Sequence, residues 1–239
     1  MVNYIPDIPI SRASKIAGIG YVIIFVLGLI TNFFVFGNLI VPGDATTTTN
    51  NILSHELLFR GGMVSWVIVL ICDIVIAWAL YIFLKPVNKS ISLLGAWFRI
   101  VYSAIFAITQ LNLLIVLILL SGADYLTVFN TEQLNSLVLL FLNGFNYGFI
   151  IGLVFFGVHL LVISHLIIRS DYIPKILGIL LLLSSLGYII DSFANFLLSN
   201  YEDYKTIFLI LVAVPGIVGE LSFTLWLLIK GTNVQQITQ

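Results

Sequence analysis

Six stretches of this chain are longer and more apolar than a soluble fold can accommodate, and they restrict its architecture more than any other feature. They cover about residues 15–41, 61–84, 91–120, 147–168, 174–199 and 206–230. A bilayer core is about 30 Å thick, and roughly 20 helical residues cross it. Lipid offers the backbone no hydrogen bonds, which favours helices. The stretches therefore predict an all-α fold, a polytopic bundle of six transmembrane helices.

Composition supports this interpretation. Hydrophobic residues make up 60% of the chain and charged residues 9%, whereas a soluble domain has about 25% charged residues. The formal charge of −1 offers no basic face for nucleic acid, so no nucleic-acid partner is expected. We expect one membrane domain over 1–239, with membrane lipids as partners and a small molecule as a candidate ligand. The oligomeric state is not readable from the sequence.

The basic residues in the loops and tails and at the ends of the spans fall mainly on one side of the predicted topology. One set of loops and tails holds Arg12, Lys15, Lys85, Lys89, Arg169, Lys175 and Lys230, and the opposite set holds Arg60 and Lys205. Because cytoplasmic loops carry an excess of Lys and Arg, both termini are predicted to lie in the cytoplasm.

Two connections on the opposite, outer side are too apolar to be simple loops. Residues of about 46–59 and 132–142 mix leucines with polar side chains, and Thr131 suits the N-cap of the second segment. Each segment predicts a short amphipathic helix in the outer interface of the membrane.

Five ionisable residues lie inside the predicted spans, where each costs about 2.5–3.5 kcal/mol at the bilayer centre and needs a partner. Four of them lie eight to eleven residues from the cytoplasmic ends of their helices and define an inner polar layer: Asp73, Arg99, His159 and Glu220. Each lies on the small or polar face of its helix, so the four side chains are predicted to face the bundle interior as a candidate binding site.

Each member of the inner polar layer also has a purely structural interpretation. Asp73 and Arg99 on consecutive antiparallel spans suit an ion pair that locks helices together, and an interior histidine such as His159 often serves only as a hydrogen-bonding group. If Arg99 serves Asp73, then Glu220 needs His159, a cation or its own proton.

A second polar group is predicted nearer the outer side. Asp191 lies on that side of the fifth span, and the other outer candidates are Arg60, Asn143, Asn146 and Asn195. These residues suit an outer polar vestibule, although Arg60 equally suits an interaction with lipid headgroups.

The sequence gives little support for cofactor chemistry. His159 and His165 lie on one helix about 120° out of phase, which does not suit a haem. Asp73, His159 and Glu220 come nearest to a zinc triad, but Arg99 shares their layer, so no metal is expected. The chain has no G-x-S-x-G elbow, P-loop or G-x-G-x-x-G motif. We expect no cofactor and name no catalytic residue.

Five segments carry a family resemblance. They are VPGDATTTTNNILSHELLFR, ICDIVIAWALYIFLKPVNKS, LVFFGVHLL, LGYIIDSFANFLL and VGELSFTLWLLIKG. In this order, from about Ser14 to Gly231, the chain resembles the bacterial and archaeal membrane family of domain of unknown function 4386. The resemblance implies a prokaryotic cell membrane and marks Asp73, His159, Asp191 and Glu220 as typical polar residues. It implies no activity.

Three functions suit these observations. The first is binding of a lipid or small molecule at the inner polar layer, with proton-coupled transport as one form of it. The second is an intramembrane lipid-modifying enzyme with Glu220 and His159 as an acid–base pair. The third is a non-catalytic accessory or assembly protein whose polar layer only fixes helix packing.

Overall fold

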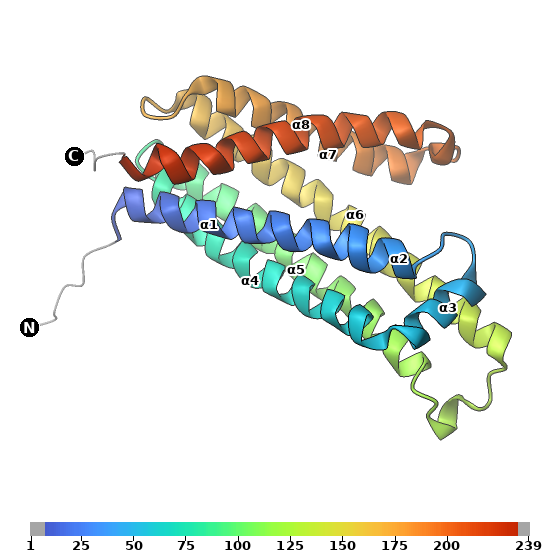
Figure 1. The fold of residues 1–239 in the computed structure, drawn as a ribbon. Helices are drawn as coiled ribbons and strands as arrows, with labels where there is room; N and C mark the ends of the chain where they lie inside the picture. Colours follow the sequence, from blue (N-terminus) through green and yellow to red (C-terminus); the bar gives the residue numbers. More distant parts are fainter. Residues whose placement is uncertain (1–7, 234–239) are drawn as a thin grey trace, which may run out of the picture. The chain divides into compact units, whose positions relative to one another are not determined.

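The computed structural model describes residues 8–233, and within them the fold is helical without strands. Helix α1 (Ile10–Leu29) continues through the π-helical segment η1 (Ile30–Phe36) into α2 (Gly37–Leu39), and the short helix α3 (Ala45–Ser54) follows. The long helices are α4 (Glu56–Leu84), α5 (Lys89–Leu119), α6 (Thr131–Arg169), α7 (Lys175–Leu197) and α8 (Tyr201–Ile229) (Figure 1). Single 3-10 turns occur at η2 (Asp124–Leu126) and η3 (Gly231–Asn233).

Six helical segments are long and apolar enough to cross a membrane. They are Ile10–Leu39, Glu56–Leu84, Lys89–Leu119, Thr131–Arg169, Lys175–Leu197 and Tyr201–Asn233. The predicted all-α architecture with six spans is thus confirmed, and the protein is a multi-pass membrane protein. The ends of the predicted domain, 1–7 and 234–239, lie outside the described residues.

The first predicted short helix exists, but it is shorter than expected. Asp44 caps α3 by accepting hydrogen bonds from the hydroxyl group and the backbone N–H of Thr47, and these bonds hold the pKa of the Asp44 carboxyl below its usual value. The helix ends at His55, whose φ of −132° and ψ of 42° are not helical. Residues 56–59 therefore begin α4, although the amphipathic pattern runs across this break.

The second short helix is not a separate element, and this prediction was wrong. Residues 132–142 are the beginning of the 39-residue helix α6, which runs unbroken from Thr131 to Arg169. Gly144 and Gly148 do not interrupt it, because their missing side chains leave room for Asn112 and Thr109 of α5. The N-cap is Asn130 rather than Thr131, since Asn130 and Gln133 each accept a hydrogen bond from the other's backbone N–H at 2.9 Å.

The chain divides into two compact units. Unit 1 comprises Met1–Val22, Cys72–Tyr102 and Leu153–Gln239, and unit 2 comprises Ile23–Ile71 and Ser103–Gly152. Every boundary falls inside one of the helices α1, α4, α5 and α6, so no loop separates the units. The single membrane domain over 1–239 stays a prediction.

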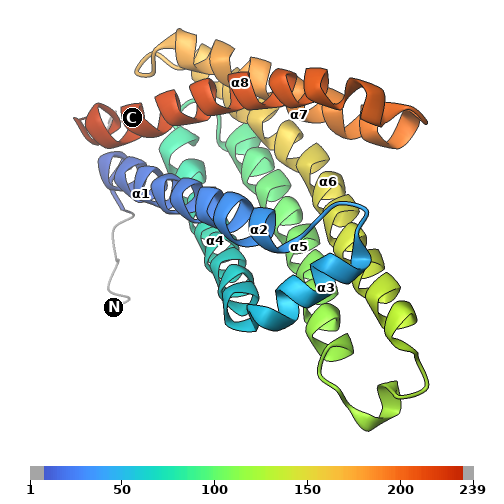
Figure 2. The same ribbon diagram turned by 45° about the vertical axis from the view of Figure 1, so that its right-hand side comes forward.

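In unit 1, α7 and α8 run side by side (Figures 1 and 2). A Cβ atom at Gly187 would lie 2.6 Å from the carbonyl oxygen of Leu211, so only glycine fits at this contact. That carbonyl has no intrahelical partner at Pro215, four residues later, because proline lacks an N–H. Ser184 of α7 donates a hydrogen bond to the Pro215 carbonyl at 2.7 Å. Glycine and serine therefore allow α7 to approach the backbone of α8.

Unit 2 is held largely by aromatic packing. The ring centroids of Trp66 and Phe106 are 5.2 Å apart, and those of Phe106 and Phe149 are 4.9 Å apart. Phe36 packs against Phe59 at 5.7 Å. Such contacts suit a membrane interior, where association depends on van der Waals packing rather than on exclusion of water.

Candidate functional site

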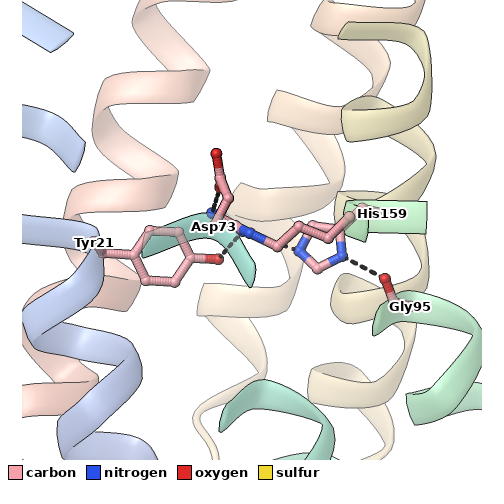
Figure 3. Close-up of polar contacts among 5 residues, drawn as sticks. Tyr21, Asp73, Gly95 and His159 are labelled. Carbon is pink, nitrogen blue, oxygen red and sulfur yellow. Dashed lines mark hydrogen bonds and ion pairs between the residues drawn. The ribbon is translucent and has the colours of Figure 1, made fainter. Parts of the chain in front are cut away.

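The inner polar layer is centred on Arg99 of α5, within unit 1. Its side chain is only 1% exposed, and its Nη2 donates to Oδ1 of Asp73 on α4 at 2.6 Å. Asp73 is equally buried, at 2% exposure. The predicted Asp73–Arg99 ion pair is thus confirmed. Figure 3 shows Asp73, Tyr21 and His159 directed toward this one guanidinium group.

His159 of α6 uses both ring nitrogens within this network. Its Nδ1 lies 2.8 Å from the carbonyl oxygen of Gly95, and its Nε2 lies 3.2 Å from Nη1 of Arg99 (Figure 3). A carbonyl only accepts and a guanidinium only donates, so Nδ1 carries the proton and Nε2 accepts. His159 is therefore a neutral imidazole with a fixed tautomer, and neither nitrogen bonds to Glu220.

Aromatic side chains surround the guanidinium group. The Tyr21 hydroxyl accepts a hydrogen bond from Nη1 of Arg99 at 2.8 Å. The Arg99 Cζ atom also lies 4.8 Å from the ring centroid of Tyr21 and 5.5 Å from that of Phe156, which are cation–π distances. Sequence reasoning missed Tyr21 because it searched for ionisable groups. The available signal was that Tyr21 is the one polar side chain between Lys15 and Thr31.

Asp73 has bonding capacity beyond the ion pair. Its Oδ2 atom is buried and accepts no hydrogen bond from the residues that the structure describes. The contact with Arg99 is therefore end-on through one oxygen rather than a bidentate pair.

Glu220 of α8 stands apart from the ion pair. Its Oε1 accepts a hydrogen bond from the hydroxyl group of Tyr188 on α7 at 2.9 Å. The Tyr188 ring packs edge-on against Phe156, with centroids 5.3 Å apart, and Phe156 is the ring that lies beside Arg99. Glu220 is half-buried, and within residues 8–233 its carboxylate has no other hydrogen bond and no ion pair. It is thus a carboxylate with one neutral partner.

The outer candidates are distributed over both units. In unit 1, Asp191 of α7 accepts a hydrogen bond from the Tyr201 hydroxyl at 2.6 Å, and Asn195 is half-buried one turn later. In unit 2, Arg60 pairs with Glu56 of its own helix at 2.6 Å, and both side chains are about half exposed. Asn143 and Asn146 are exposed on α6. Asp191 and Arg60 each have a partner of their own, and the vestibule stays a prediction.

Among the described residues, no three His, Cys, Asp or Glu side chains are placed to hold one metal ion together. Asp73 and His159 both contact Arg99, while Glu220 contacts Tyr188. The three side chains of the conceivable zinc triad thus each have a protein partner.

Comparison with known proteins identifies the family. The model of a domain of unknown function, DUF4386, matches residues 16–231. The chain belongs to the DUF4386 family. This DUF4386 protein is also similar to an uncharacterized protein of Archaeoglobus fulgidus, with 32% identity over 170 residues that cover 71% of this chain and 83% of the relative. No solved structure matches the chain.

Proposed function

We propose that this DUF4386 protein binds a lipid or small molecule through Glu220 and Tyr188 inside the membrane. The observation that carries the proposal is the bonding of Glu220, whose carboxylate has a single neutral hydrogen-bond partner. A lone carboxylate in low dielectric is costly unless it takes a proton or a positively charged partner. A ligand with an ammonium group or several N–H donors would replace that proton, so binding would release a proton.

The Arg99 network supports this site without being its ligand-binding group. Arg99 already donates to Asp73, Tyr21 and His159. These contacts join segments of α1, α4, α5 and α6, and the shared Phe156 ring extends the same packing to Tyr188. The network thus holds the neighbours of Glu220 in fixed positions, which lowers the entropic cost of binding.

The test is native mass spectrometry of the protein purified in mild detergent. We expect the wild-type protein to retain a stoichiometric ligand, Glu220→Gln to lose it and Tyr188→Phe to retain less of it. Asp191→Asn is the matched control, because Asp191 is also a carboxylate bonded to one tyrosine hydroxyl. Full retention by Glu220→Gln, or a ligand-free mass for the wild type, contradicts the proposal.

A second candidate is the accessory or assembly function, which the Arg99 network favours because Asp73, Tyr21 and His159 all bond to Arg99 within the fold. Under that function, Glu220→Gln would bind and fold like the wild type, while changes at Arg99 would unfold the protein. The intramembrane lipid-modifying enzyme has less support, because both nitrogens of His159 bond to groups other than Glu220.

We also propose that the protein lies in the prokaryotic cell membrane with both termini in the cytoplasm. The support is the excess of Lys and Arg on the side of the predicted topology that holds the termini. Single cysteines at Ser90 and Asn130, in a Cys72→Ala background, test this orientation. In intact cells an impermeant thiol reagent should label Asn130→Cys and not Ser90→Cys; the reverse pattern would invert the topology.

A further inference from the structure

Unit 1 carries an apolar groove that is separate from the Glu220 site. It has a volume of about 350 Å³ and lies between α5, α6 and α7. Its walls are Ile91, Leu161, Val162, Ser164, His165, Ile168 and Leu182. Ser164 donates its hydroxyl proton to the Leu161 carbonyl at 2.8 Å, so His165 is the one lining side chain with free polar atoms at the surface.

Two cations lie at the helix ends that adjoin this groove, just beyond the residues that line it. Arg169 is the last residue of α6 and lies four residues after His165, on the same helix face. Lys175 is the first residue of α7 and lies seven residues before Leu182, again on one face. Both are exposed, and within residues 8–233 neither forms an ion pair. Asp171 is the one acidic residue in the connection between them.

The groove therefore has an apolar body and a basic end. Leu161 lies eight residues from Arg169, which is about 12 Å along the helix axis, and Leu182 lies about 10 Å from Lys175. Helix ends with basic side chains lie at the level of lipid phosphates, and the interior of the same leaflet is hydrocarbon. The order of the two surfaces along the groove matches the order of headgroup and acyl chain in a phospholipid.

We propose that this groove is a binding site for an anionic phospholipid, with its phosphate on Arg169 and Lys175 and an acyl chain against Leu161, Ile168 and Leu182. Charge complementarity identifies the occupant, because an apolar groove alone accepts any lipid, whereas two cations without an ion pair at the adjoining helix ends select a negative headgroup. The site is independent of the ligand proposed for Glu220.

The experiment is native mass spectrometry after equilibration with mixed vesicles of phosphatidylglycerol and phosphatidylcholine. The wild-type protein should retain phosphatidylglycerol in preference to phosphatidylcholine, and the preference should decrease with added salt. Each of Arg169→Gln and Lys175→Gln should weaken phosphatidylglycerol retention about fivefold, and Leu161→Trp should fill the groove and abolish retention. Lys205→Gln and Leu186→Trp are the controls, because they change an exposed cation and an exposed leucine outside the groove.

The outcomes separate this site from that of Glu220. Loss in the groove variants, with normal retention in both controls and in Glu220→Gln, supports the proposal. Equal retention of the two lipids by the wild type overturns it, and so does unchanged phosphatidylglycerol retention when both cations are removed. A variant that unfolds is recognised by its thermal transition. The proposal is then tested by the lipid preference and the salt dependence of the wild-type protein alone.

Discussion

The two units manage polar side chains inside the membrane in different ways. Unit 1 has an ionic interior, in which Arg99 bonds to Asp73, Tyr21 and His159. Unit 2 has an interior of aromatic rings, and its one ion pair in the described chain, Glu56–Arg60, is half exposed on a single helix. Charged groups in low dielectric need fixed partners, so the ionic interior specifies which helix faces meet more strictly than aromatic packing does.

The buried polar groups of unit 2 that lack a partner among the described residues are uncharged. In unit 2, both amide atoms of Gln110 and the Nε1 atom of Trp66 are buried without a hydrogen-bond partner among the described residues. An unpaired neutral group costs a folded protein far less than an unpaired charge. Unit 2 can therefore tolerate these groups, whereas unit 1 could not tolerate Arg99 without Asp73.

The largest expected effect comes from Arg99. Arg99→Met leaves the Asp73 carboxylate buried without its cation and should lower the free energy of unfolding by about 3–5 kcal/mol. Arg60→Met, its control in unit 2, should cost under about 1 kcal/mol because that ion pair is exposed. Both are measured by SDS unfolding of the purified protein.

Adding Asp73→Leu to Arg99→Met should recover most of the lost stability, since both charges are then gone. Equal losses of unfolding free energy in Arg99→Met and Arg60→Met, or no recovery in the double variant, would contradict this difference between the units.

The second-largest effect comes from replacing a glycine at a helix contact with alanine. The two units differ in which atoms the added methyl group approaches. Gly187→Ala in unit 1 meets the Leu211 backbone oxygen, and Gly148→Ala in unit 2 meets the Thr109 side chain. Each should cost about 1–3 kcal/mol of unfolding free energy. Thr109→Ser removes the methyl group that Gly148→Ala meets and should restore stability there.

Gly28→Ala is the neutral control for both glycine substitutions, because nothing lies within 4 Å of a Cβ at that position. The interpretation fails if Gly187→Ala is as stable as Gly28→Ala, or if Thr109→Ser brings no rescue of Gly148→Ala.

Two isosteric changes should shift stability in opposite directions. Ser185→Ala in unit 1 removes a hydroxyl group that donates to the Gly157 carbonyl at 2.8 Å and should destabilise the protein by about 1 kcal/mol. Gln110→Met in unit 2 removes two unpaired buried atoms and should stabilise it by about 1 kcal/mol. Thermal unfolding in one detergent measures both, and destabilisation by Gln110→Met would show that its amide has a partner.

The smallest effect concerns the cap of α3 in unit 2. Because hydrogen bonds from Thr47 lower the pKa of Asp44 in the folded protein, the cap contributes stability above the unfolded pKa of about 3.9 and loses it as the pH falls through the lowered folded pKa. Hydrogen exchange of α3 amides should therefore accelerate at acidic pH, beyond its intrinsic pH dependence. Asp44→Asn keeps a capping oxygen and should abolish this pH dependence; an unchanged profile would contradict it.

Part of the candidate site could be predicted from residue type and depth alone. Asp73 and Arg99 lie at similar depth on consecutive helices, so each has few other possible partners. In the structure the two side chains form an ion pair. The partners of His159 and Glu220 could not be predicted in this way. Depth identifies a layer, but the rotation of each helix about its axis decides which members of the layer touch.

Sequence reasoning also placed one helix boundary wrongly for a tertiary reason. The amphipathic segment 132–142 and the apolar span from 147 were predicted as separate helices, but the structure joins them in an unbroken α6, whose Gly144 and Gly148 let Asn112 and Thr109 of α5 pack closely against it. A glycine in an isolated stretch weakens a helix, whereas a glycine facing a neighbouring helix permits close packing.

The sequence by itself determined six membrane-spanning helices, because span length and apolar content are properties of each segment alone. It also placed Asp73, Arg99 and His159 inside these helices, and all three are buried. Only the tertiary structure decided that His159 is a neutral bridge between Gly95 and Arg99 and that Glu220 bonds to Tyr188. These pairings depend on the rotation and close approach of helices distant in the chain, which glycine contacts and hydrogen bonds fix together.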